Sequence, residues 1–297
     1  MRRGLVAVLA VAAAGAAAEG QVVSRTVGSV TFRADLARAR PGGVIIASVA
    51  SRVRLGAVFA ILHGRRVPLY ASTLGPRALV PIAVETPAGS DVLGFEVWGR
   101  RGRQRIPLDV AIAPADFPAR TVTIPEDRRG LLGAPGVVAE SRRLLQLLRT
   151  ESPLRLATLP FRAPLTREPA ASFGASQTWQ GGSPVESLMD GIYGDRHRGL
   201  DYEGAGGLPL APAAGIVLYA GSRTLTGGTV VLDHGEGIVS LFGHLARQDV
   251  HEGDRIEAGT PLGLVGDTGV AYGPHLHWGV YLHGVAVDPR VILELGE

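Results

Sequence analysis

Residues 273–278, with the sequence GPHLHW, carry two histidines separated by one apolar residue. In a β-strand, residues i and i+2 point to the same face, so His275 and His277 would face one cleft while Leu276 packs into the core on the other side. Two imidazoles placed in this way are typical of a metal site. The alternative is a pair of polar residues on a solvated strand face.

Two further segments add histidine and carboxylate to the same part of the chain. All but one of the 8 histidines lie after residue 190, a clustering that suggests shared chemistry. Residues 197–201 (HRGLD) place His197 and Asp201 four positions apart, and they can reach one metal if the backbone turns at Gly199. Residues 240–245 (SLFGHL) place His244 near a strand end. Each segment alone is weak evidence, whereas the three together predict one site.

In this order, the three segments resemble peptidase family M23, the lysostaphin-like zinc endopeptidases. The resemblance covers about residues 171–289 and includes further short motifs at 172–174 (SFG), 253–259 (GDRIEAG), 266–269 (GDTG) and 287–289 (VDP). Several ordered motifs are much more specific than one. The resemblance implies a lysostaphin-type, antiparallel all-β catalytic domain.

The resemblance also implies a role for five residues. His197, Asp201 and His277 would be the ligands of Zn²⁺, and the fourth tetrahedral position would be left for a water that the metal activates near neutral pH. His244 and His275 would be an unligated pair beside the metal. His275 is then the candidate general base, and His244 the candidate group that stabilises the oxyanion or orients the water. The family leaves the division between these two histidines open.

The donor types favour zinc. Two imidazoles and one carboxylate with an open position suit hydrolytic zinc, whereas non-haem iron sites with the same donors use a different fold and spacing. The chain has no Cys, which excludes thiol catalysis and Cys-type zinc sites. Any metal must therefore be held by His, Asp or Glu.

Two positions depart from the family pattern without removing a ligand. Many members carry Tyr where this chain has Phe242, and a small Ser or Thr is usual where it has Tyr272. The stretch 175–196, which contains Trp179 and Tyr193, could form a flap over the groove or a plain surface loop.

The other histidines are expected to be solvent-exposed. His63 is expected at a hairpin tip, and turns are expected at His234, His251 and His283. Of these, only His234 is a candidate spare ligand.

The first half of the chain predicts a separate β domain. Residues 22–124 contain short apolar segments at the spacing of a small antiparallel sandwich, with strands expected at 44–49, 57–62, 77–84 and 93–98. This pattern resembles the immunoglobulin-like domains that precede some wall peptidases. The domain shows no cluster of catalytic residue types, so we expect it to position the enzyme or to bind a protein partner.

Residues 125–160 are predicted to be a linker with a helix at 137–150, packed on one domain. From residue 161 to 297 the chain is rich in glycine, with strands expected at 229–232, 238–242, 261–265 and 275–282 and no helix-length periodic segment. The predicted fold class is therefore mainly β, with two β domains joined by a short helical linker.

Residues 1–18 read as a signal peptide. Arg2 and Arg3 precede an apolar run at 5–14 and the small residues 16–18, and the run is short for a membrane span. We expect cleavage and export, with no membrane span afterwards; an uncleaved anchor is the alternative. Cleavage removes two of the 30 basic side chains and none of the 27 acidic ones, so the net charge falls from +3 to +1. Such a charge gives no case for nucleic-acid binding.

These observations predict an exported zinc metalloendopeptidase that cuts cross-links or stem peptides of peptidoglycan. A periplasmic enzyme is favoured over a secreted one. The first alternative is an activator of cell-wall amidases, because some relatives have lost their ligands; here all three ligands are present. The second is a biotinyl-like or sugar-phosphotransfer module, which would need a modified Lys or a phosphorylated His in the cytoplasm, and the chain has no Lys.

Overall fold

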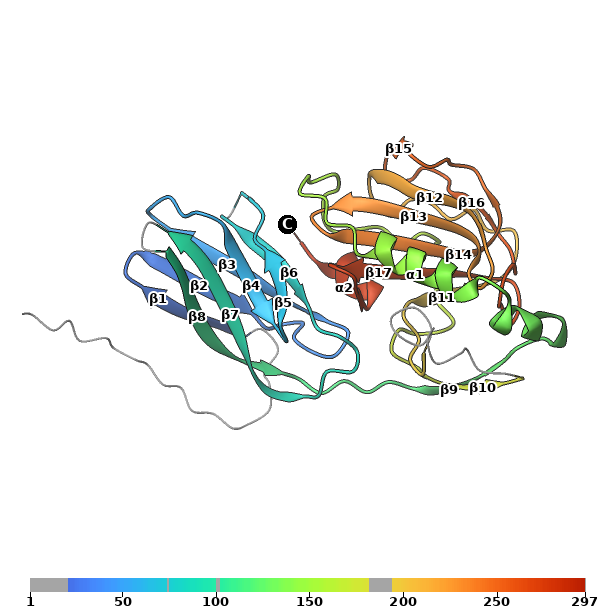
Figure 1. The fold of residues 1–297 in the computed structure, drawn as a ribbon, viewed down its shortest axis with the longest axis horizontal. Helices are drawn as coiled ribbons and strands as arrows, with labels where there is room; N and C mark the ends of the chain where they lie inside the picture. Colours follow the sequence, from blue (N-terminus) through green and yellow to red (C-terminus); the bar gives the residue numbers. More distant parts are fainter. Residues whose placement is uncertain (1–20, 74, 100–101, 182–193, 297) are drawn as a thin grey trace, which may run out of the picture.

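The chain forms two β-rich lobes that lie side by side along the long axis (Figure 1). The structure is a computed structural model that describes residues 21–296 except 74, 100–101 and 182–193. The predicted signal peptide, 1–18, lies outside the described residues. No helix in the described part of the chain is long and apolar enough to cross a membrane.

The N-terminal lobe is a sandwich of two four-stranded antiparallel sheets, ordered β1-β2-β3-β6 and β5-β4-β7-β8. Inward-facing apolar residues alternate with outward-facing ones along the strands, and the two inner faces share one core, in which the rings of Phe32 and Phe95 lie 5.2 Å apart. The predicted β-sandwich is confirmed. Its strands are β1 (Val22–Val27), β2 (Val30–Asp35), β3 (Val44–Ser51), β4 (Val58–Leu62), β5 (Arg65–Pro68), β6 (Arg77–Pro81), β7 (Gly89–Gly99) and β8 (Gly102–Ile112).

The next strand, β9 (Ala119–Thr123), belongs to neither sheet of the sandwich although it falls within the range 22–124. It pairs in parallel with β10 (Ser176–Gln180), with Arg120 opposite Gln177. This pairing carries the chain from the sandwich to the far lobe and places residues 119–123 beside it (Figure 1).

The linker contains a 3₁₀ helix, η1 (Glu126–Gly133), and α1 (Val137–Leu148). The helix predicted at 137–150 is confirmed to within two residues. Its apolar face buries Leu144 and Leu148 in the core of the C-terminal lobe, so the helix packs on one domain, as expected.

The C-terminal lobe is built on one antiparallel sheet of eight strands, with the path β11-β17-β14-β13-β12-β15 and with β16 and β18 paired to β14 and β17. Both faces of the central strands are covered, so every residue of β13 is buried. The strands are β11 (Leu200–Glu203), β12 (Gly215–Arg223), β13 (Gly227–Gly235), β14 (Ile238–Gln248), β15 (Arg255–Ile256), β16 (Gly263–Val265), β17 (His275–Leu282) and β18 (Val285–Val287).

One helix follows the sheet, and its six residues are too few to show a period in the sequence. This helix, α2 (Pro289–Glu294), begins where the Asp288 side chain accepts a hydrogen bond from the Arg290 backbone N–H.

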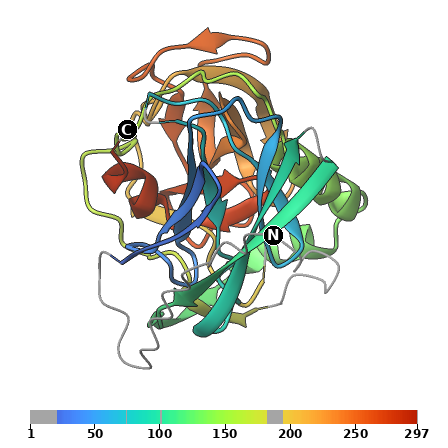
Figure 2. The same ribbon diagram turned by 90° about the vertical axis from the view of Figure 1, so that its left-hand side faces the viewer.

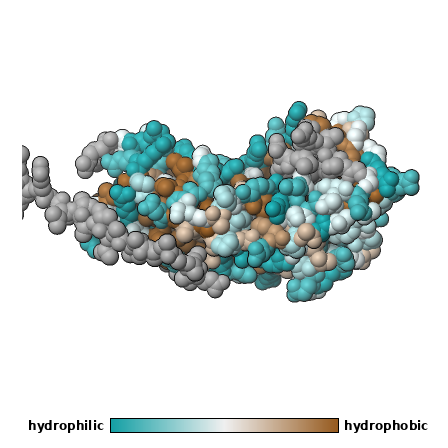
Figure 3. Space-filling view, turned by 90° about the horizontal axis from the view of Figure 1, so that it is seen from below, coloured by the Kyte–Doolittle hydropathy of each residue, from teal (hydrophilic) through white to brown (hydrophobic). Residues whose placement is uncertain are grey.

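The sandwich contacts the C-terminal lobe, in front of which it lies in the end-on view of Figure 2. Val44 and Val84 belong to the core of the C-terminal lobe, and the Asp288 N–H donates to the Gly42 carbonyl at 2.7 Å. Arg65 Nη1 donates to the His283 carbonyl at 2.7 Å. On the face seen in Figure 3, hydrophilic residues cover much of the surface, with hydrophobic residues scattered among them.

Two histidines that were expected in solvent are buried, so that prediction was wrong for His234 and His283, which are 1% and 3% exposed. His234 lies near the end of β13, where it donates from Nδ1 to the Ala214 carbonyl at 2.8 Å and accepts from Ser240 Oγ at 2.9 Å. Both ring nitrogens are used within the core, so His234 is not a spare ligand. The side chains of His251 and His63 are exposed, as predicted.

We expect His234 to make folding sensitive to acid. Burial lowers its pKa from 6.5 to about 4, so between these values the unfolded chain binds a proton that the folded chain does not. This contribution to stability is fully present above pH 6.5 and is lost as the pH falls towards 4, by up to about 3 kcal/mol.

The measurement is the free energy of unfolding in urea at pH 7.5, 6 and 5. His234→Gln should lower stability at pH 7.5 but should lose less of it on acidification than the unsubstituted protein. The exposed His251 provides the control His251→Gln, which should keep the original pH dependence. Equal pH dependence in all three proteins would contradict the assignment.

Candidate metal centre

Three neighbouring strands place Asp201 and His277, two of the predicted ligands, in one row across the sheet. In the order β11-β17-β14, Asp201 is opposite His277, and His277 is opposite Gly243. Residues opposite each other on antiparallel strands project on the same face. Leu276 is fully buried on the other face, as the strand pattern predicted.

His197 precedes β11 and is oriented by residues 172–174. Its Nδ1 donates to the Ser172 carbonyl at 3.0 Å, and its own carbonyl accepts from the Gly174 N–H at 2.7 Å. A carbonyl oxygen only accepts, so the Nδ1 proton is fixed and Nε2 is the nitrogen available to a metal.

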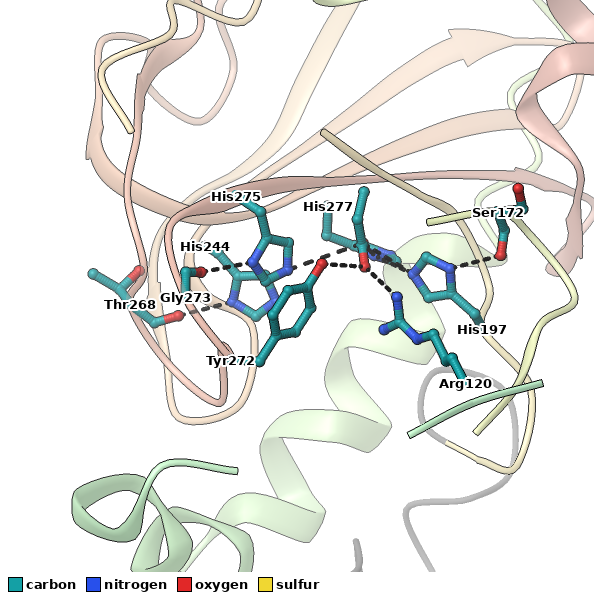
Figure 4. Close-up of polar contacts among 10 residues, drawn as sticks. Arg120, Ser172, His197, His244, Thr268, Tyr272, Gly273, His275 and His277 are labelled. Carbon is teal, nitrogen blue, oxygen red and sulfur yellow. Dashed lines mark hydrogen bonds and ion pairs between the residues drawn. The ribbon is translucent and has the colours of Figure 1, made fainter. Parts of the chain in front are cut away.

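The rings of His197 and His277 lie side by side (Figure 4), and both contact the carboxylate of Asp201. Oδ1 of Asp201 lies 2.9 Å from His197 Nε2 and 3.0 Å from His277 Nδ1, and the two nitrogens are 3.2 Å apart. Neighbouring donors in a tetrahedral zinc site are about 3.3 Å apart, given metal–ligand distances near 2.0–2.1 Å. Of the described residues, only this group of three offers donor atoms grouped closely enough to hold a metal ion. The donor types and spacing fit zinc.

Gly199 serves the centre by its lack of a side chain. Its φ is not in the left-handed region, so the turn expected from glycine's conformational freedom is not its role. A Cβ at this position would lie 2.7 Å from His277 Cε1 and 2.6 Å from the Trp278 carbonyl oxygen. The glycine lets the 197–201 segment approach the His277 ring closely enough for the three donors to meet.

His244 and His275 lie beside this cluster as a pair, with ring centroids 4.6 Å apart. His244 Nδ1 donates to the Thr268 carbonyl and His275 Nδ1 to the Gly273 carbonyl, both at 2.8 Å. In each ring the Nδ1 proton is therefore committed to the backbone, which leaves Nε2 as the other functional atom. His275 Nε2 is 4.0 Å from Asp201 Oδ1.

The backbone at His244 has an unusual conformation that serves this arrangement. Gly243 is opposite His277 on the cleft side, so regular alternation would point the next residue towards the core, where Phe242 is fully buried. His244 instead has a left-handed φ of 63°, and its ring lies against His275. A non-glycine residue in this region costs about 1–3 kcal/mol, a strain often found at functional sites.

Burial sets the protonation of these groups. It lowers the pKa of His275 and His277, and it lowers that of His244 to about 3, with the neighbouring His275 adding to the effect. His244 and His275 are therefore neutral at pH 7, and each offers an Nε2 lone pair. Burial alone would raise the pKa of the Asp201 carboxyl, but contacts with His197 and His277 hold that pKa well below its usual range.

Two side chains that sequence analysis did not assign to the site hold the other oxygen of Asp201. Arg120 Nη1, from β9, donates to Oδ2 at 3.0 Å, and the Tyr272 hydroxyl donates to the same oxygen at 3.2 Å. The Tyr272 ring also stacks on His275 at 4.3 Å. Tyr272 stood out in the sequence only as a departure from a family pattern. Arg120 carries no local signal, because it lies 81 positions from its partner.

The structure thus brings together all five of the residues that the sequence singled out. Within the possible flap at 175–196, residues 176–180 form β10 and the Trp179 indole N–H donates to the Gly194 carbonyl. Residues 182–193 of that stretch, with Tyr193, lie outside the described part of the chain.

Comparison with known proteins is consistent with this geometry. Residues 195–289 match peptidase family M23. The DD-carboxypeptidase/endopeptidase Mpg of Neisseria meningitidis is 35% identical over 94 residues, which are 31% of this chain and 22% of that protein. The peptidoglycan DD-endopeptidase ShyC of Vibrio cholerae is 33% identical over 97 residues, 32% of this chain and 22% of that protein. The chain therefore aligns with about a fifth of the length of these relatives.

One solved structure is similar over most of the chain. A crystal structure from Pseudomonas aeruginosa that bears the name peptidase M23 superposes with a TM-score of 0.61 at 27% sequence identity. The superposition covers 88% of this chain and 97% of that one, so the similarity extends beyond residues 195–289 to the N-terminal lobe.

We expect the purified chain to bind one Zn²⁺ through His197, Asp201 and His277. A ligand that binds only the folded state at 100 times its Kd raises the free energy of unfolding by about 2.7 kcal/mol. Thermal unfolding with and without zinc should show this increase in the unsubstituted protein, whereas His277→Ala should lose most of it. His251→Ala, which changes an exposed histidine, should keep it. Equal stabilisation of all three proteins would exclude the assigned ligands.

Proposed function

Residues 195–289 are a domain of peptidase family M23, and on this premise we propose that the chain is an exported zinc metalloendopeptidase that hydrolyses peptide bonds of peptidoglycan. The observation that carries the proposal is the convergence of three metal-donor atoms beside two neutral imidazoles. A catalytically inactive protein would not need all three metal donors and both unligated histidines.

The chemistry divides between the metal and the chain. When bound, Zn²⁺ supplies a Lewis acid that polarises the scissile carbonyl and acidifies a water. His197, Asp201 and His277 would hold the ion, and His244 and His275 lie beside these three residues. These groups are largely buried, so the charges formed during reaction are screened less than they would be in bulk water.

His275 is the better candidate for the general base. Its Nε2 is the neutral acceptor adjacent to Asp201, whose negative charge would stabilise the imidazolium that forms when His275 takes a proton from water. The same proton can then pass to the leaving amine. The pKa of His244, about 3, makes it a poorer base, and we assign it to orienting the water and the developing oxyanion.

The substrate and the compartment are inferred from the relatives and from the N-terminus. Mpg is named a DD-carboxypeptidase/endopeptidase, and ShyC a peptidoglycan DD-endopeptidase. Residues 1–18 predict export, which would bring the enzyme to the cell wall, in the periplasm if an outer membrane is present. The sandwich, which lacks the metal-donor cluster, is proposed to position the enzyme or bind a protein partner.

The proposal is tested by digesting purified cross-linked peptidoglycan with the zinc-loaded protein and identifying the products by mass. Cross-linked dimers should disappear, and His275→Ala should slow this by about 10²–10⁴-fold, the usual contribution of a general base. His251→Ala should digest at the original rate, and a chelator should stop the reaction.

A zinc-bound protein that releases no product would contradict the peptidase proposal. If the same protein then increased the activity of a cell-wall amidase, it would be an activator. Mass analysis of the products would also identify the bond that is cut.

A further inference from the structure

The two oxygens of the Asp201 carboxylate have separate partners. Oδ1 faces the imidazole nitrogens of His197 and His277, whereas Oδ2 accepts from Arg120 and Tyr272. A carboxylate can bind a metal through one oxygen or both, and it can rotate between these modes. Hydrogen bonds to one oxygen select the other for the metal and fix the plane of the group.

We propose that Arg120 and Tyr272 are positioning residues that clamp Oδ2 of Asp201, so that the metal centre is completed by a strand outside residues 195–289. The inference rests on the proposed zinc site and adds to it a dependence on β9. It concerns the affinity and geometry of the metal site, and it holds whichever peptide bond the enzyme cuts.

Arg120 is well placed for this role. Its strand is fixed by the parallel ladder between β9 and β10, and its side chain is only 21% exposed where it meets the 2% exposed carboxylate. A charge-assisted hydrogen bond in such surroundings is strong and directional. The guanidinium also lies 5.4 Å from the Tyr272 ring, so the two donors support each other's position.

Tyr272 joins the clamp to the catalytic histidines. Its ring stacks on His275 with an angle of 18° between the planes, while its hydroxyl reaches Oδ2. The side chain is therefore held from two sides. A Ser or Thr at this position is too short to span both contacts, so the departure from the family pattern has a structural use here.

A competing effect has the opposite sign. The positive charge of Arg120 repels a cation, so its removal could strengthen zinc binding. The geometry favours the clamp, because Arg120 meets the oxygen that points away from the other donors and has no contact with the imidazole nitrogens of His197 or His277 in the described structure. Tyr272 separates the two effects, since its hydroxyl orients the carboxylate without adding charge.

The test measures zinc affinity by competition with a chromophoric chelator in the full chain. Second-sphere partners of metal ligands typically contribute 10–100-fold to affinity. Tyr272→Phe and Arg120→Met should each weaken zinc binding about 10-fold. Arg120→Lys, which keeps the charge and loses the planar fork, should also weaken it. The visible spectrum of the Co²⁺-substituted protein should change in the same variants, because the carboxylate is no longer held in one mode.

Matched controls lie outside the site. Arg129 donates to the Ile124 carbonyl and Tyr219 to the Ser222 carbonyl, so Arg129→Met and Tyr219→Phe should keep the original zinc affinity. Thermal unfolding of each metal-free variant shows whether the fold is intact, and Arg120→Lys takes the place of Arg120→Met if the latter unfolds.

The outcomes distinguish this inference from the proposed function. Unchanged or tighter zinc binding by folded Tyr272→Phe and Arg120→Met, in a chain that otherwise binds zinc, would overturn the clamp alone. Weaker binding in these variants supports the clamp even if the unsubstituted protein digests no peptidoglycan. A chain that binds no zinc would overturn both.

Discussion

The site depends on the register of three adjacent strands. Asp201 on β11, His277 on β17 and Gly243 on β14 stand in one row, and the two candidate ligands in this row come within 3.0 Å because the ladder places them opposite each other. A shift of one residue in either pairing would turn a ligand towards the core. The buried residues on the opposite face, among them Leu276, Trp278 and Phe242, prevent that shift, since each would lose its place in the core. Hydrophobic packing thus determines the geometry of the candidate metal centre.

The local motifs indicated which side chains come together, because strand geometry links the spacing of residues in the sequence to the direction of their side chains. Alternation along the strand requires the side chains of His275 and His277 to share one face. The order of the three segments then indicated that these two histidines lie near His197, Asp201 and His244. The burial of His234 and His283 could not be predicted in this way. Glycine and polar neighbours suggest an exposed turn at each of these histidines, but segments distant in the sequence cover them. Phe161 packs on His234, and Arg65 of the sandwich donates to the carbonyl of His283. Arg120 was missed for the same reason, because nothing near residue 120 indicates a partner in β11.

Backbone carbonyls have an unexpectedly large part in the site. Three histidines of the site donate Nδ1 protons to the carbonyls of Ser172, Thr268 and Gly273, and all three carbonyls lie in loops. The short motifs at 172–174 and 266–269 are explained by this geometry more than by any chemistry of their side chains. They place an acceptor where an imidazole must be held in one tautomer. These two short motifs therefore determine which ring nitrogen carries the proton in His197 and in His244, although both histidines lie more than 20 positions away in the sequence.

The route of the chain through β9 bears on how separable the two lobes are. The polypeptide leaves the sandwich, adds one strand beside β10, forms the linker helix on the sheet, and only then enters the segment that the family shares. The segment that matches the family is therefore preceded by β9 and α1, which pack on the same lobe, the first of them beginning some 75 residues earlier, so the edge of the matched segment is not a boundary of folding. Residues 195–289 are therefore poorly suited to transfer as a module into another protein. A fusion that begins at residue 195 would contain the three candidate ligands but would lack Ser172 and Arg120, which contact them.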